Sequence, residues 1–157
     1  MRFEKHCWAE IDLDALLNNY RFIRRTVGGD VCAVLKADAY GHGALAVADA
    51  LRAAGCAAFA GSCLAEAREL RRHGLTEPLL ILGYTDPAFA DELAALDITQ
   101  TLFSSEYAAA LSAAATAAGC TVACHLKADT GMGRIGFALR TDFEAVSYTH
   151  LTLPTIL

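Results

Sequence analysis

The sequence predicts an α/β fold in which parallel strands form the first part of a TIM-like (β/α)8 barrel. Short apolar runs rich in strand formers alternate with longer runs of helical period, and the pattern repeats about every 20 to 25 residues. This alternation is typical of parallel βα units joined by right-handed crossovers. No GxGxxG sequence directly follows a strand, since the one present, GMGRIG at residues 131–136, begins four residues after the expected strand at 121–127. Polar residues follow the strand C-terminal ends, where barrels carry their sites. Because a complete barrel needs ~250 residues, we expect about five of the eight units in these 157 residues.

The first expected strand covers residues 6–11 and leads into a helix. Asp12 or Asp14 can cap this helix, because a carboxylate at that position accepts a hydrogen bond from a free backbone N–H. Its apolar residues recur at spacings of three and four, as one face of a helix requires. They are Leu13, Leu16, Leu17, Tyr20 and Ile23. The glycines of residues 28–30 end the helix, and residues 31–35 form the next expected strand.

The remaining units repeat the same cycle of strand and helix. The strands are expected at residues 57–60, 79–82, 98–103 and 121–127. The helices between them are expected to begin after the glycine-rich turn at 40–43, at Leu64, at Asp86–Pro87, and at a cap formed by Ser104 or Ser105. Their expected ends are marked by Gly55, by Gly74 and, for the alanine-rich last helix, by Gly119.

Composition and charge exclude several classes of protein. The chain is 55% hydrophobic and carries 13 Lys and Arg residues against 18 Asp and Glu residues, a net charge of −5. This charge argues against a nucleic-acid-binding protein, which would be expected to carry a basic stripe. No run approaches the ~18 consecutive apolar residues of a membrane span, and the first residues lack the apolar region of a signal peptide. We therefore expect a cytoplasmic protein without a membrane segment.

The six cysteines are expected to be buried or half-buried free thiols. None forms a Cys-x-x-Cys pair, and most lie inside apolar runs. A chain of this length and hydrophobicity can build its own core without disulfide bonds. The alternative is a zinc site at Cys120, Cys124 and His125, but this cluster lacks a second pair of ligands at the usual spacing.

The first candidate site lies in the segment AVLKADAYGHG, residues 33–43. Lys36 directly follows an expected strand, so its amine would lie at the mouth of a barrel, where it can act as a nucleophile or a base. Tyr40 could direct its hydroxyl to the same place, and the flanking glycines let the backbone approach a ligand closely. The alternative is a lysine that simply extends from the strand end into solvent.

The second candidate site lies in the segment HLKADTGMGRIG, residues 125–136. Lys127, Asp129 and Arg134 follow another expected strand, in a loop whose three glycines allow unusual backbone angles. Three ionisable groups after one strand could form a solvated loop. Two such clusters at the C-terminal ends of different strands favour a functional site.

These two segments, in this order and about a hundred residues apart, resemble the signature segments of alanine racemase. This family consists of pyridoxal-phosphate enzymes with a barrel domain and a C-terminal β domain. The opening segment WAEIDLDAL at residues 8–16 and the sequence AEA at residues 65–67 also resemble the family. The resemblance covers residues 8–137, which is most of this chain but under half of a family member.

The resemblance implies roles for five residues. Lys36 would carry pyridoxal 5'-phosphate through its amine and act as a base at one face of the substrate Cα. Tyr40 would hydrogen-bond the cofactor phosphate, and Leu82 would line the cofactor pocket. Arg134 would reach the phenolic oxygen of the cofactor and orient the substrate carboxylate. Lys127 matches a lysine that can be carbamylated in the family, and the carbamate would hold Arg134 in place. No metal is expected.

Two features of the family's site are not matched in this chain. The second catalytic base of the family is a tyrosine of the C-terminal β domain, contributed by the partner subunit, and the arginine that faces the pyridine nitrogen also lies beyond the matched region. We therefore expect the C-terminal β domain to be absent here, the full-length protein to be a homodimer, and the 157 residues alone to be inactive.

The implied function is the interconversion of L-alanine and D-alanine, which supplies D-alanine for peptidoglycan. One alternative is a racemase for another small amino acid, such as serine. A second alternative, of a different class, is a non-catalytic pyridoxal-phosphate-binding carrier protein of the same barrel fold.

The chain divides into two segments by composition. Residues 1–146 are expected to be the N-terminal part of the barrel domain. Residues 147–157 contain no alanine and no Asp, Glu, Lys or Arg, after a segment rich in both kinds. This change favours a foreign or misread tail over a native terminal segment.

Overall fold

The computed structural model describes residues 7–138 and 140–149 and confirms the predicted α/β fold. Its centre is a sheet of five parallel strands in the order β1-β2-β3-β4-β5, so that each strand pairs with the next one along the chain. This order is the one that successive βα units produce in a barrel. The strands are β1 (Cys32–Val34), β2 (Ala58–Gly61), β3 (Leu79–Ile81), β4 (Ile98–Leu102) and β5 (Cys124–Leu126).

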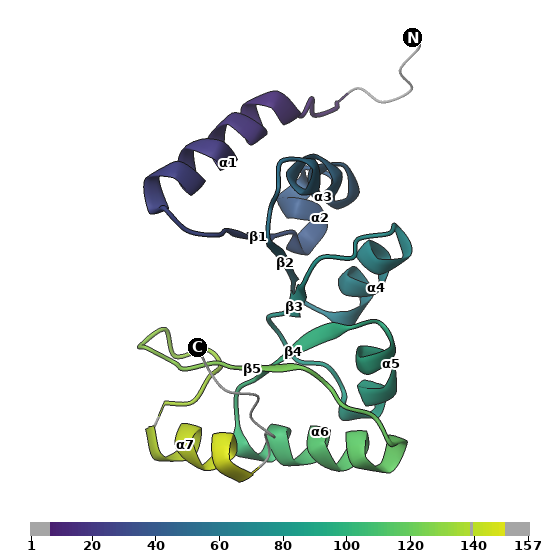
Figure 1. Cartoon of the computed structure of the whole chain (residues 1–157), viewed down its shortest axis with the longest axis vertical. Coiled ribbons are helices and arrows are strands. Elements are labelled where there is room, and N and C mark those ends of the chain that lie inside the picture. Colours follow the sequence, from purple (N-terminus) through teal and green to yellow (C-terminus); the bar gives the residue numbers. More distant parts are fainter. Residues whose placement is uncertain (1–6, 139, 150–157) are drawn as a thin grey trace.

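The helices connect these strands, and Figure 1 shows α3, α4 and α5 along one side of the sheet. The described helices are α1 (Leu13–Val27), α2 (Lys36–Gly41), α3 (Ala44–Ala53), α4 (Leu64–Arg72), the short 3-10 helix η1 (Pro87–Phe89), α5 (Ala90–Ala95), α6 (Ser105–Ala118) and α7 (Arg140–Thr149). None of the helices in the described part of the chain is both long and apolar enough to cross a membrane. Residues 150–157 of the predicted tail lie outside the described residues.

The two faces of the sheet differ in burial, because side chains alternate along each strand. On the face packed against the helices, the aligned residues Phe59, Leu79 and Ile98 are at most 1% exposed. On the other face, the aligned residues are Val34, Ala60, Leu80 and Thr99. Of these four, Val34 is exposed, Leu80 and Thr99 are half-buried, and only Ala60 is buried. The helix-covered face therefore forms the core, and the opposite face is open. We call it the open face.

The structure selects one of the two predicted caps for each of two helices. Asp12 accepts a hydrogen bond from Ala15 N at 2.9 Å and caps α1, and Gly28 ends this helix in the left-handed conformation. Ser104 accepts from Tyr107 N at 3.1 Å and caps α6, which ends at Gly119 in the same conformation. These side chains satisfy backbone N–H groups that the first turn of a helix leaves free.

The predicted strand at residues 6–11 is wrong for residues 7–11, which are exposed and form no regular element. Residue 6 lies outside the described residues. An apolar, strand-forming sequence needs a neighbouring strand for its backbone hydrogen bonds, and β1 pairs only with β2 in the described part of the chain. The last strand, β5, also begins three residues later than the predicted residues 121–127.

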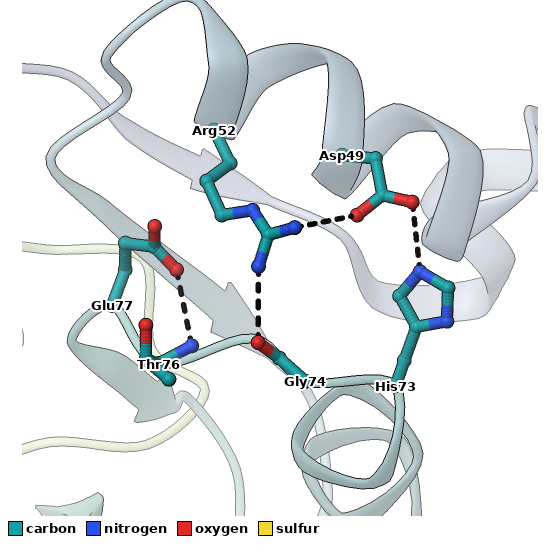
Figure 2. Close-up of polar contacts among 6 residues, drawn as sticks. All are labelled: Asp49, Arg52, His73, Gly74, Thr76 and Glu77. Carbon is teal, nitrogen blue, oxygen red and sulfur yellow. Dashed lines mark hydrogen bonds and ion pairs between the residues drawn. The ribbon is translucent and has the colours of Figure 1, made fainter.

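A polar cluster joins α3 to the end of α4 (Figure 2). Asp49 accepts a hydrogen bond from Arg52 at 3.3 Å, and its other oxygen lies 2.8 Å from His73 Nε2. Arg52 also donates to the carbonyl of Gly74 at 3.0 Å. The His73 hydrogen bond lowers the pKa of Asp49 below its ordinary value. The cluster therefore fixes the turn after α4 against the preceding unit.

All six cysteines are free in the structure, as predicted. Their burial agrees only in part with the prediction, because Cys7 and Cys32 are exposed. Cys32 lies on β1 in the same alternation as Val34, so its side chain belongs to the open face.

Candidate functional site at the strand ends

The predicted site residues lie where parallel strands end. Lys36 follows β1, Leu82 follows β3, and Lys127 follows β5. Since the strands are parallel, these three positions share one edge of the sheet. For each of the three, the strand residue two positions earlier belongs to the open face. Because side chains alternate along a strand, all three side chains are directed toward that face. This edge is the one at which barrels carry their sites.

Lys36 begins an unusual turn of left-handed helix. Ala37, Asp38, Ala39 and Tyr40 have φ between 52° and 57° and ψ between 35° and 51°. Residues other than glycine rarely adopt this conformation, and it costs roughly 1–2 kcal/mol per residue. Four consecutive residues in this region therefore need strong local support, and strain of this kind is often found at functional sites.

The turn is held in part by its own backbone and by Asp38. Ala39 N donates to Leu35 O at 2.8 Å, and Gly43 N donates to Asp38 O at 3.0 Å. The carboxylate of Asp38 accepts from Ala44 N at 2.7 Å, at the start of α3. Asp38 thus connects the turn to the first residue of the next helix. This side-chain role was not predicted from the sequence.

Glu66, in the first turn of α4, supports the turn from the neighbouring unit. Its Oε1 accepts from Ala37 N at 2.8 Å, and its Oε2 accepts from Ser62 N at 2.7 Å and from Ser62 Oγ at 2.9 Å. Burial raises the pKa of Glu66, but the hydrogen bonds from Ala37 and Ser62 outweigh burial, and the pKa lies below its ordinary value. In the sequence, Glu66 is notable only as the middle residue of the AEA segment at residues 65–67. An acidic residue one turn after a strand end was the available signal.

Lys36 and Tyr40 lie together on α2. Lys36 is half-buried, and its Nζ lies 5.6 Å from the centroid of the Tyr40 ring, within the range of a cation–π interaction. Tyr40 is 61% exposed. The amine and the phenol therefore stand at the same place at the end of β1, and a ligand can reach the tyrosine.

Lys127 fixes the loop that carries Arg134. Its Nζ donates to the carbonyl of Ile135 at 2.8 Å. The backbone of Phe137 donates to Lys127 O at 2.8 Å and accepts from Asp129 N at 2.9 Å. The residue next to Arg134 is therefore bound to the end of β5, while Arg134 itself is exposed.

Asp129 stabilises the other side of this loop. Its Oδ1 accepts from Gly131 N at 3.0 Å and from Gly133 N at 3.1 Å. These hydrogen bonds, that of Gly133 first, lower the pKa of Asp129 below its ordinary value. Gly136 has φ 134°, and a Cβ there would lie 2.8 Å from Asp129 N. The sequence predicted correctly that this loop needs glycines, since only a residue without a Cβ fits at this position.

The side chains at this edge have a definite chemical character. They provide two amines, one phenol and one guanidinium, which suit a ligand that carries anionic groups and an electrophilic carbon. The structure brings Lys36 close to Tyr40, and it places Lys127 and Arg134 in or beside one loop. Leu82 is half-buried at the end of β3, which lies between β1 and β5 in the sheet.

A metal site finds no support in the residues that the structure describes. Among them, no three His, Cys, Asp or Glu side chains are grouped so that they could hold a metal ion. The zinc alternative at Cys120, Cys124 and His125 therefore has no complete set of ligands there.

Comparison with known proteins gives one consistent family. The family model described as "Alanine racemase, N-terminal domain" matches residues 11–156. Among curated proteins, the alanine racemase of Clostridium perfringens strain SM101 is 49% identical over 131 residues. This match covers 83% of the chain and 34% of the relative. The chain thus spans about a third of the length of the curated relatives it matches.

Solved structures agree with this result. The alanine racemase of Clostridium difficile 630 superposes with a TM-score of 0.76 and 42% identity, over 83% of this chain and 35% of that one. A histidine racemase from Leuconostoc mesenteroides subsp. sake superposes with a TM-score of 0.81 and 34% identity, over 85% of this chain and 36% of that one. The similar structures therefore include racemases of more than one amino acid.

Proposed function

The chain belongs to the alanine racemase N-terminal domain family, and we propose that the protein interconverts L-alanine and D-alanine with pyridoxal phosphate. One observation carries the proposal. Lys36 extends from a strained left-handed turn at the carboxyl end of β1, with Tyr40 beside it. The relatives named alanine racemase support alanine as the substrate. We further propose a cytoplasmic homodimer whose D-alanine serves peptidoglycan synthesis.

The residues present fit pyridoxal phosphate. The cofactor has an aldehyde, a phosphate and a phenolic oxygen, and the strand ends offer partners for each. The half-buried amine of Lys36 suits the aldehyde, and the exposed hydroxyl of Tyr40 suits the phosphate. Arg134, in a loop fixed at its neighbour Ile135, suits the phenolic oxygen. Leu82, half-buried at the end of β3, suits the apolar ring.

Within this proposal the protein contributes orientation and proton transfer. When bound, pyridoxal phosphate withdraws electrons from the substrate Cα, so that its proton can be removed near neutral pH. Lys36 then takes or returns a proton at one face of Cα through Nζ. Arg134 orients the substrate carboxylate, because a guanidinium binds a carboxylate through two parallel hydrogen bonds.

Lys127 has a supporting role in the proposal. Its amine already binds the carbonyl of Ile135, next to Arg134. Carbamylation of this amine would replace a cation with an anion and so remove a charge that repels Arg134. We propose that the carbamate then holds the guanidinium in place.

A racemase for another amino acid is the second candidate. The 34% identity and TM-score of 0.81 with a histidine racemase favour this possibility, and serine was the alternative expected from the sequence. A non-catalytic carrier of pyridoxal phosphate remains the alternative of a different class. It would bind the cofactor but would not exchange the Cα proton of any amino acid.

Racemisation by the full-length protein tests the proposal. With pyridoxal phosphate, the protein should convert L-alanine to D-alanine and release deuterium from Cα-deuterated alanine faster than from serine or histidine. Lys36→Ala should abolish turnover, and Arg134→Ala should reduce it more than about tenfold, since charge-assisted contacts of this kind contribute that much. Arg140→Ala is the control, because Arg140 is an exposed arginine that forms an ion pair with Glu144 on the same helix.

The outcomes separate the candidates. Faster exchange with serine or histidine would identify that amino acid as the substrate in place of alanine. Cofactor binding without any exchange at Cα would favour the carrier protein. Near-native turnover in Arg134→Ala would refute the role of Arg134.

A further inference from the structure

We propose that Glu66 is a positioning residue for Lys36, which holds the left-handed turn so that the lysine amine faces the open side of the sheet. The proposal rests on the proposed function for the use of the amine, but the geometry of the turn can be tested without it. Glu66 does not act on the substrate; it acts through the peptide bond that follows Lys36.

The carboxylate of Glu66 joins three segments at one point. One oxygen accepts the N–H of Ala37, the residue directly after Lys36, at 2.8 Å. The other oxygen accepts the N–H and the hydroxyl of Ser62, directly after β2, at 2.7 and 2.9 Å. Because Glu66 itself lies on α4, the carboxylate links the turn, the end of the adjacent strand and the following helix.

The turn needs such an external contact. Four consecutive non-glycine residues in the left-handed region cost several kcal/mol by the usual figure of roughly 1–2 per residue. The backbone hydrogen bonds from Ala39 and Gly43 lie in the later part of the turn. The contact with Glu66 is made at Ala37, its first left-handed residue. Loss of that contact should therefore free the peptide nearest to Lys36.

The sequence around β2 leaves room for this carboxylate. A Cβ at Gly61 would lie 3.2 Å from Oε2 of Glu66 and 3.5 Å from its Cβ. Any larger residue at the end of β2 would press on the side chain that accepts from Ser62. A glycine at this position thus fits a carboxylate at the strand end.

A carboxylate suits this position better than an amide. Three donors converge on its two oxygens, so both oxygens must accept. Glutamine has one accepting oxygen, and when this oxygen takes the two donors of Ser62, the NH2 group faces the N–H of Ala37 as donor against donor. The change Glu66→Gln should keep the volume of the side chain while breaking one half of the link.

Amide hydrogen exchange tests the positioning directly. In the wild-type protein the Ala37 amide should be protected, and in Glu66→Gln it should exchange at least about tenfold faster, as expected for the loss of a hydrogen bond to a charged group. Glu69→Gln, an exposed site on the same helix, should exchange at the wild-type rate at Ala37. If Glu66→Gln does not fold, Glu66→Asp, whose carboxylate is one methylene shorter, should give the same acceleration.

Labelling of Lys36 provides the second measurement. With pyridoxal phosphate and borohydride, Glu66→Gln should label Lys36 at least about fivefold more slowly than wild type, and Glu69→Gln should match wild type. Equal Ala37 exchange in Glu66→Gln and wild type, or an unprotected Ala37 amide in wild type, would overturn the inference. Wild-type protein that protects Ala37 but takes no label on Lys36 would instead contradict the proposed function and leave the role of Glu66 in the turn intact.

Discussion

A single side chain, Arg71, satisfies carbonyl groups from two different connections. On the scale of single residues, no other side chain in the described part of the chain donates to as many backbone carbonyls. Its guanidinium donates to Leu75 O and Glu77 O after α4, and to Leu96 O and Asp97 O after α5, at 2.7 to 2.8 Å. A planar group with five donors can reach four acceptors at once, and a lysine ammonium with three donors cannot.

We therefore predict that Arg71→Lys lowers the free energy of unfolding by about 1–3 kcal/mol, because partly buried carbonyls lose their donors. Urea denaturation followed by circular dichroism measures this change. Arg72→Lys, the exposed neighbour on the same helix, should stay within about 0.5 kcal/mol of wild type. Equal midpoints for Arg71→Lys and Arg72→Lys would show that Arg71 does not connect the two loops.

Residue positions in the site could be predicted where they depend on the strand pattern alone. Lys36 and Lys127 follow short apolar strands, so their places at the sheet edge were predictable from the sequence. The contact between Glu66 and Ala37 joins residues 29 positions apart. No local pattern specifies it, because it depends on how two βα units pack.

On the scale of elements, the left-handed turn α2 has a backbone conformation that the local preferences of its residues do not predict. The segment contains alanines, which favour a right-handed helix, and the structure instead gives Ala37 φ 52° and ψ 51°. The neighbouring strand and Asp38 and Glu66 determine the local conformation. By contrast, the sequence left only two candidate residues for each of the caps that Asp12 and Ser104 form, since capping depends on residues close in sequence.

At one residue of this turn, a substitution by glycine should have the opposite effect on the free energy of unfolding from its usual effect in a helix. Ala37→Gly should leave the free energy of unfolding unchanged or raise it by up to about 1 kcal/mol, because glycine adopts positive φ without the Cβ penalty. Ala110→Gly, at an exposed position within α6, should instead destabilise it by about 1 kcal/mol. Thermal or urea unfolding compares the two variants. A loss of about 1 kcal/mol in both would mean that Ala37 is not held in the left-handed region.

The predicted strand at residues 6–11 illustrates the opposite case. Its sequence suits a strand, but strand formation depends on a partner that lies elsewhere in the chain. Residues 7–11 form no strand with the described residues. Local sequence could therefore not decide this element.

On the scale of the whole molecule, the described sheet has two free edges and one open face. β1 and β5 each pair with a single strand among the described residues. Val34 on the open face is exposed, and α1 exposes Phe22, Ile23 and Val27. Unpaired edges and exposed apolar side chains favour association with other chains.

We predict that a polypeptide of these 157 residues self-associates in solution and does not racemise alanine. Sedimentation velocity over a range of concentrations measures the association, and the Cα-deuterium assay measures the activity. Increasing sedimentation coefficients with concentration are the expected result. A monomer at all concentrations that also racemises alanine would show that the open sheet is sufficient on its own.

Lys36 is the residue that we propose binds pyridoxal phosphate. The most direct test is borohydride reduction of the full-length protein loaded with this cofactor, followed by peptide mass spectrometry. These 157 residues contain three lysines, Lys5, Lys36 and Lys127, and peptide mapping distinguishes them from one another and from lysines elsewhere in the protein. We expect label on Lys36 and none after Lys36→Ala. Label on any other lysine, with Lys36 unmodified, would contradict this assignment.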